Sequence, residues 1–137
     1  MKKTLQVVGA IIVKDGKILA VKRGANKNQA VAYKYEFVGG KIEEGETPKA
    51  ALKREVFEEM DYDVEVGEKF MEVLYEYDDV FVNLQTYLCK PLSEHYVLKE
   101  HIDHKWLSQS DLFSVEWAPA DLDIISKLQD LDLDNIK

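Results

Sequence analysis

Residues 40–62 constrain this chain more than any other segment, because they join a short glycine-containing loop to an acid-rich amphipathic helix. Thr47 suits the N-cap and Pro48 suits the first helical position, so a helix is predicted from Thr47 to Met60. At about 100° per residue, four charged side chains fall within an arc of roughly 140° around this helix. These are Arg54, Glu55, Glu58 and Glu59. The other side, predicted to enter the core, carries Leu52, Val56, Phe57 and Met60.

The acidic face of this helix needs a counter-charge, since carboxylates three or four residues apart are neighbours and repel one another. Taken alone, such a face is more often simply solvated. The preceding segment, residues 36–41, changes this interpretation, because Gly39 and Gly40 allow close approach of the backbone and a carbonyl oxygen can join the carboxylates. Hard divalent cations prefer oxygen ligands. The sequence therefore predicts a divalent-metal site where the loop meets the helix.

Charge and composition exclude several function classes. The net charge is −8, with 12 basic and 5 acidic residues in 1–54 against 6 and 21 in 55–137. A strongly acidic protein repels duplex nucleic acids over a long range, so a small phosphate ester bridged by metal ions is expected and a nucleic acid polymer is not. No apolar run approaches the roughly 20 residues that span a bilayer. The single cysteine, Cys89, excludes an intrachain disulfide and favours the cytoplasm.

The rest of the pattern mixes strands with one further helix. Strands are predicted at 5–13, 18–23, 63–77 (as one strand or two), 80–88 and 105–107. Segments 24–34 and 90–99 are predicted loops. Cys89 is interpreted as a strand-end residue. The last helix is predicted from Pro119 to Leu131, with Leu122, Ile125 and Leu128 facing inward and Ile124 as a further candidate.

The residue pattern alone assigns no metal-binding role to the histidines and no base-stacking role to the aromatic residues. The spacing of His95, His101 and His104 fits no usual zinc ligand set, and no cysteine joins them. Trp117 and Phe37 are large enough to stack on a base, but burial in the core is an equally good interpretation of both.

The acidic segment resembles the Nudix box, G-x5-E-x7-R-E-U-x-E-E-x-G-U, in which U is a bulky aliphatic residue. The residues that match in register are Gly40, Glu46, Arg54, Glu55, Val56, Glu58 and Glu59. Asp61 stands where the family has glycine, and Tyr62 replaces the final aliphatic residue. The glycine would close the helix in a left-handed conformation, which Asp tolerates better than most residues. We therefore expect a modest loss of stability and unchanged chemistry.

The resemblance extends over nearly the whole chain and narrows to the MutT-type nucleoside triphosphate pyrophosphohydrolases. It is carried by the strings at 21–23, 36–42, 45–48, 99–100 with Trp106, and 117–121. The resemblance implies one Nudix domain over residues 1–137. Its implied fold class is α+β, an α/β/α sandwich with a mixed β-sheet between helices.

The implied reaction converts a nucleoside triphosphate and water into a monophosphate and diphosphate, with Mg²⁺ or Mn²⁺ as cofactor. The implied metal ligands are the Gly39 carbonyl, Glu55, Glu58, Glu59 and Glu100. A water deprotonated by a carboxylate, with Glu55 and Glu100 as the two candidates, would attack the β-phosphorus. Arg54 and Glu46 are expected to support the site by pairing with each other or by orienting Glu58.

The resemblance also implies a set of nucleotide-binding residues. This set does not decide which base is bound. Its members are Arg23, Glu36, Phe37, Val38, Gly39 and Asp121. Val38 replaces the proline usual in this loop. Asp121 stands where a purine-reading enzyme often has Asn, and it lacks the amide donor unless it is protonated.

The expected substrate is an oxidised guanine nucleotide, as in 8-oxo-dGTP diphosphatases, with a cytidine triphosphate as the alternative. A nucleotide-sugar or dinucleotide pyrophosphatase and a catalytically silent nucleotide-binding module are further alternatives. The chain is expected to be a monomer or a homodimer.

Overall fold

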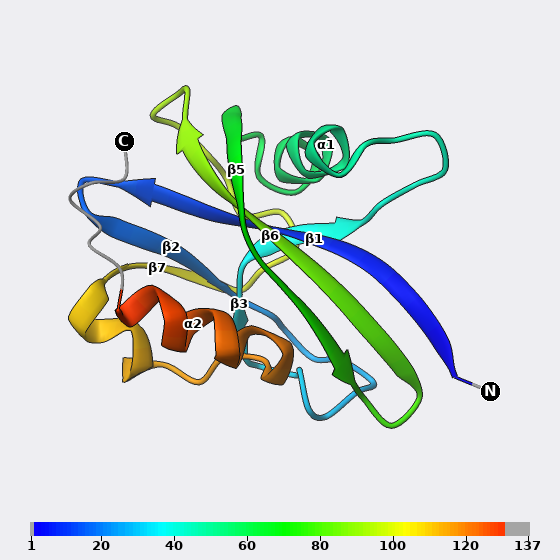
Figure 1. Ribbon diagram of the computed structural model, residues 1–137. Coiled ribbons are helices and arrows are strands. Elements are labelled where there is room, and N and C mark those ends of the chain that lie inside the picture. Colours follow the sequence, from blue (N-terminus) through cyan, green and yellow to red (C-terminus); the bar gives the residue numbers. More distant parts are fainter. Residues whose placement is uncertain (1, 131–137) are drawn as a thin grey trace.

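The computed structural model describes residues 2–130 of the protein (Figure 1). Seven strands form one mixed sheet in the order β3-β2-β1-β6-β5, with β4 paired to β1 and β7 paired to β2. The strands are β1 (Lys3–Lys14), β2 (Lys17–Lys22), β3 (Tyr35–Glu36), β4 (Val38–Lys41), β5 (Val64–Glu76), β6 (Val80–Pro91) and β7 (Asp103–Ser108). The helices are α1 (Pro48–Met60), the 3₁₀ turns η1 (Gln109–Ser114) and η2 (Pro119–Asp121), and α2 (Leu122–Gln129).

Strand β1 lies at the centre of the sheet, and two different strands pair with successive parts of one of its edges. It runs parallel to β6 over most of its length, as Val8 pairs with Gln85. On its other edge, Val7 to Ala10 pair with β4, while Val13 and Lys14 pair with β2. Gly39 allows the close approach of β4, because a Cβ there would overlap the Val8 carbonyl. The divergence of β4 and β2 from one strand leaves room between them.

The two helices cover opposite faces of the sheet, as Figure 1 shows. Helix α1 buries Leu52, Val56 and Met60 in one apolar cluster. Helix α2 buries Ile124 and Leu128 in a second cluster. This arrangement confirms the expected α+β class, with a mixed sheet between helices.

Helix α1 begins and ends as predicted. The Thr47 hydroxyl accepts a hydrogen bond from the Ala50 amide at 3.1 Å, and Pro48 opens the helix. Asp61 closes it in the left-handed conformation, with φ of 50°. Tyr62 is fully buried and stacks at 4.8 Å on Tyr96, so an aromatic ring fills the place of the aliphatic residue.

The prediction that Phe57 enters the core is wrong, since its side chain is 54% exposed. Leu52, Val56 and Met60 lie four residues apart and form one stripe against the sheet. Phe57 is turned about 100° from Val56 and falls outside this stripe.

The C-terminal prediction also needs correction. The segment is a 3₁₀ turn followed by α2, not one helix from Pro119, and Leu131 lies outside the described residues. Leu122 is 41% exposed, so its predicted inward position is wrong. Ile124, which the pattern left as a further candidate, is buried, because at about 100° per residue it shares one arc of α2 with Ile125 and Leu128, and Leu122 falls outside this arc.

Three smaller points complete the fold. Residues 64–76 form one strand, with register shifts between Val66 and Met71. Cys89 is buried inside β6, which continues to Pro91, so it does not end the strand. Within residues 2–130, no helix combines the length and apolar character that a membrane crossing needs.

Candidate active site

A cavity of about 480 Å³ lies where β1, β4 and α1 meet the loops before β3 and β7. Eight of the predicted site residues line it: Arg23, Glu36, Phe37, Gly39, Glu55, Glu59, Glu100 and Asp121. Glu46, Arg54, Glu58 and Val38 do not line it. Val38 is buried in the apolar cluster under α1. The cavity therefore joins predicted site residues that stand up to 98 positions apart in the chain, from Arg23 to Asp121.

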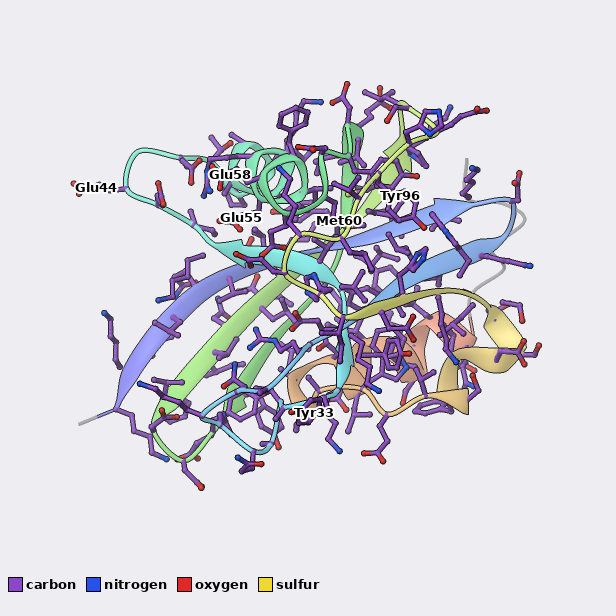
Figure 2. All side chains as sticks on the ribbon, turned by 180° about the vertical axis from the view of Figure 1, so that it is seen from behind. Tyr33, Glu44, Glu55, Glu58, Met60 and Tyr96 are labelled. Carbon is purple, nitrogen blue, oxygen red and sulfur yellow. The ribbon has the colours of Figure 1, made fainter. Side chains whose placement is uncertain are left out.

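Arg54 organises the carboxylates beside the cavity. It donates to both oxygens of Glu46, from Nε at 2.6 Å and from Nη2 at 2.8 Å. Its Nη1 donates to Glu55 at 2.8 Å and to Glu58 at 3.1 Å. The hydrogen bonds from Arg54 and from the Glu43 amide lower the pKa of Glu46 to about 2. Arg54 and Glu46 thus pair with each other, and Arg54 also holds Glu55 and Glu58. Figure 2 shows Glu55 and Glu58 together on α1.

Glu59 is the acid of this group that lacks a partner. Its Oε2 is buried without a hydrogen bond. Burial, with the negative charges of Glu55, Glu100 and Glu36, raises the pKa of Glu59 to about 8. A buried carboxylate without a donor is costly unless a cation balances it.

The donor set at this end of the cavity fits a divalent cation. The oxygens of Glu55, Glu59 and Glu100 are the hard ligands that such an ion prefers. Gly40 lets the Glu55 carboxylate lie against β4, because a Cβ there would overlap it. In the described part of the chain, no three acidic, histidine or cysteine side chains already form a ligand cluster. Glu55 and Glu58 each bond Arg54 through one carboxylate oxygen instead.

A second group of cavity residues, here called the enclosed end, comprises Arg23, Glu36 and the buried Asp121. Arg23 donates from Nε to one oxygen of Glu36 at 2.8 Å. Asp121 is 5% exposed, and burial together with the Glu36 charge raises the pKa of Asp121 well above its ordinary value, although Arg23 opposes this. This shift favours the protonated form, in which a carboxyl group can donate one hydrogen bond and accept another.

Phe37 and Trp117 lie next to each other, with ring centroids 5.2 Å apart. Trp117 is 3% exposed, and its indole N–H donates to the Leu112 carbonyl at 2.6 Å. Of the two interpretations of Trp117, burial in the core therefore holds. Phe37 is buried as well, but one part of it lines the cavity.

His101 is a cavity residue that sequence reasoning missed. Its side chain is 6% exposed, and its Nε2 lies 3.0 Å from an oxygen of Glu36. The available signal was its position directly after Glu100. Histidine spacing gave no further signal, because it fits no zinc ligand set. His104 lies apart from the cavity and bonds Tyr96 instead.

The NUDIX domain family model matches residues 3–128, and the chain belongs to this family of hydrolases. It is 34% identical to a curated 8-oxo-dGTP diphosphatase of Escherichia coli K12, over 96% of this chain and 100% of that protein. It is 33% identical to the CTP pyrophosphohydrolase of the same organism, over 90% of each chain.

Among solved structures, the MutT protein of a methicillin-resistant Staphylococcus aureus superimposes with a TM-score of 0.74. It is 42% identical over 95% of this chain and 98% of that chain. Members of the family generally use divalent metal ions. This agrees with the unpaired acid at the cavity.

Proposed function

We propose that the protein is a metal-dependent nucleoside triphosphate diphosphatase, which converts a triphosphate and water into a monophosphate and diphosphate. The observation that carries this proposal is a cavity lined by two unlike groups of side chains. One group is acidic and includes the unpaired carboxylate of Glu59, and the other includes the buried Asp121. Such a site suits a substrate with a polyanionic group at one end and a neutral ring at the other. The family membership and the names of the relatives support the same reaction.

The acidic end would hold the phosphates through Mg²⁺, or through Mn²⁺. The proposed ligands are the Gly39 carbonyl, Glu55, Glu58, Glu59 and Glu100. When bound, a divalent ion neutralises phosphate oxygens and lowers the pKa of a coordinated water. Arg54, fixed by Glu46, bridges Glu55 and Glu58 through one guanidinium nitrogen and offsets their mutual repulsion before binding. Either Glu55 or Glu100 accepts the proton of the water that attacks the β-phosphorus.

The enclosed end would hold the base, with Arg23, Glu36, Phe37, Gly39 and Asp121 as the proposed contacts. The expected contact of Val38 is withdrawn, because its side chain is buried in the apolar cluster under α1. A neutral Asp121 offers a donor beside an acceptor. Oxidised guanine and cytosine each present an acceptor beside a donor, whereas ordinary guanine presents two adjacent acceptors, O6 and N7. This complementarity supports an oxidised guanine nucleotide as substrate, with a cytidine triphosphate as the alternative. The names of the two curated relatives correspond to these two choices.

The partner is proposed to be a small molecule, because the net charge of −8 opposes a nucleic acid polymer. Cys89 is a free, buried thiol, and burial raises its pKa to about 12. An unpaired, unreactive cysteine agrees with the reducing cytoplasm as the proposed compartment.

A diphosphate-release screen tests the proposal. The full chain with saturating Mg²⁺ is offered 8-oxo-dGTP, dGTP, CTP, dCTP, ATP and ADP-ribose, and both products are identified. The highest kcat/KM is expected for 8-oxo-dGTP, and a highest value for CTP or dCTP would select the alternative base. Preference for ADP-ribose, or binding without turnover of any triphosphate, would overturn the proposed reaction.

A further inference from the structure

Residues 96–102, the segment before β7, connect the end of α1 to the end of β2 and run along the cavity. This segment carries Glu100, which lines the cavity. Three backbone hydrogen bonds hold the segment: Val97 N to Met60 O at 2.9 Å, Lys99 N to Glu59 O at 3.3 Å and Ile102 N to Lys22 O at 2.9 Å. Figure 2 shows Tyr96, at the start of this segment, beside the end of α1 that carries Met60. Glu100 therefore lies between anchors on two different elements.

The Glu100 carboxylate does not fix its own position. Among the described residues it makes no hydrogen bond and no ion pair, and residue 100 is exposed. Its location depends on the backbone on either side. On the N-terminal side, Lys99 pairs with Asp61 at 2.7 Å, but both side chains are about half exposed. Exposed pairs of this kind hold a position weakly.

His101 supplies the anchor on the C-terminal side. Its Nε2 lies 3.0 Å from one oxygen of Glu36, while Arg23 donates to the other oxygen at 2.8 Å. An ionised carboxylate only accepts hydrogen bonds, so the Nε2–H of His101 donates to Glu36. The side chains of His101 and Glu36 are 6% and 17% exposed, so water competes little for this bond. Hydrogen bonds to charged groups are also stronger than neutral ones.

A histidine at position 101 carries a cost in folding stability, because one of its ring nitrogens is unpaired. Nδ1 is buried without a hydrogen-bond partner. A leucine of similar size would fill the same space without an unsatisfied polar atom. The bond from Nε2 to Glu36 is the contact that a leucine cannot make.

We propose that His101 is a positioning residue: its hydrogen bond to Glu36 holds Glu100 at the cavity and ties it to the residues at the base end. The proposal rests on the proposed function, because Glu100 is there a metal ligand or general base. Since Arg23 and Glu36 belong to the proposed base-binding set, a nucleotide that settles on them also steadies the loop that carries Glu100. His101 then acts through Glu100 and makes no contact with the reacting atoms.

The first test compares three variants by kcat and KM on the best triphosphate from the screen. His101→Leu keeps the volume and removes the hydrogen bond, so kcat is expected to fall by about 10–100-fold, as for other groups that orient metal ligands. His101→Gln places an amide N–H near Nε2 and is expected to recover most of this loss. His104→Leu removes another histidine hydrogen bond, to Tyr96, and is expected to stay near wild type. Equal losses in His101→Leu and His101→Gln would overturn the proposal.

The second test asks whether His101 acts through Glu100. Groups that act as one unit show non-additive effects. In a Glu100→Gln background, His101→Leu is therefore expected to cause little further loss of kcat. A full additional loss, or wild-type turnover in Glu100→Gln alone, would contradict the proposed route.

The third test does not depend on activity. Amide hydrogen exchange of residues 99–102 is measured in the metal-free protein. It is expected to be at least about tenfold faster in His101→Leu and unchanged in His101→Gln, because loss of an anchor favours local opening. Unchanged exchange in His101→Leu would refute the anchor. If His101→Leu does not fold, His101→Ala replaces it. A wild-type protein without diphosphate release would sink the proposed function, yet the exchange result would still decide whether His101 anchors the loop.

Discussion

The two ends of the cavity are built in different ways. The acidic end comes largely from one stretch of chain, in which Glu55 and Glu59 share a face of α1. At the enclosed end, Arg23 follows β2, Glu36 lies in β3 and Asp121 lies in η2. Glu59 of the acidic end is buried without a hydrogen-bond partner, whereas Glu36 of the enclosed end bonds both Arg23 and His101. An unpaired buried acid favours a cation, and a group of paired polar side chains can select a ligand by the cost of leaving polar atoms unpaired.

This contrast predicts that changes at the acidic end affect turnover, and the strongest test is Glu58→Gln. Loss of one charge from the metal-binding set is expected to lower kcat by about a hundredfold or more. The fold should persist, because the exposed pair of Glu58 with Arg54 contributes about 0–1 kcal/mol at most.

Glu44→Gln is the matched control for this variant. Glu44 lies at the outer end of the loop before α1, away from the labelled Glu55 and Glu58 (Figure 2). Its kcat is expected to match wild type, with both variants compared by diphosphate release and thermal unfolding. Wild-type turnover in Glu58→Gln would remove Glu58 from the mechanism.

At the enclosed end, Asp121→Asn is expected to change selectivity more than turnover. The amide keeps the size of the carboxyl group but replaces its O–H donor with N–H donors, so the hydrogen bonds to the base change. We expect a change of about tenfold in the ratio of kcat/KM for 8-oxo-dGTP to that for CTP, with kcat for the better substrate nearly unchanged. Steady-state kinetics on both substrates provides the measurement. An unchanged ratio would mean that Asp121 does not contact the base.

The smallest expected effect is the pH dependence of stability that Glu59 imposes. Its pKa rises from 4.5 to about 8 on folding, so between these values the folded state binds more protons than the unfolded chain. The stability of the metal-free protein therefore falls as the pH rises through this window. We expect the Tm to fall by a few degrees more in wild type than in Glu59→Gln, measured by thermal unfolding without metal. Saturating Mg²⁺ should stabilise wild type most at the upper end of the window, and parallel curves for the two proteins would count against this role of Glu59.

The acidic end could be predicted from the sequence because most of its residues lie within a few positions of one another in the chain. Helical spacing alone relates Glu55 to Glu59, and Thr47, Pro48 and Asp61 mark the helix ends through backbone preferences that act within one turn. Helical spacing predicted burial less well for residues at the edge of the apolar face of α1. Phe57 is exposed although the pattern put it in the core, because the sheet contacts only a narrow stripe of α1.

The enclosed end was predicted only through resemblance, and incompletely. Periodicity relates neither Arg23 to Asp121 nor Glu36 to His101, which is 65 residues away. His101 was missed because its role depends on a carboxylate from β3. The burial that raises the pKa of Asp121 and Glu59 arises only when the loops and sheet close around them.

By itself, the sequence determined the helix α1, its caps, its row of carboxylates and the family to which the chain belongs. These depend on contacts between residues a few positions apart, and such contacts are fixed by backbone geometry. Only the tertiary structure decided that Glu59 is buried with an unpaired oxygen, that His101 bonds Glu36 and that Asp121 is buried. Those properties depend on the dielectric surroundings and partners of each group, which distant segments supply when β1, β3 and α1 pack together.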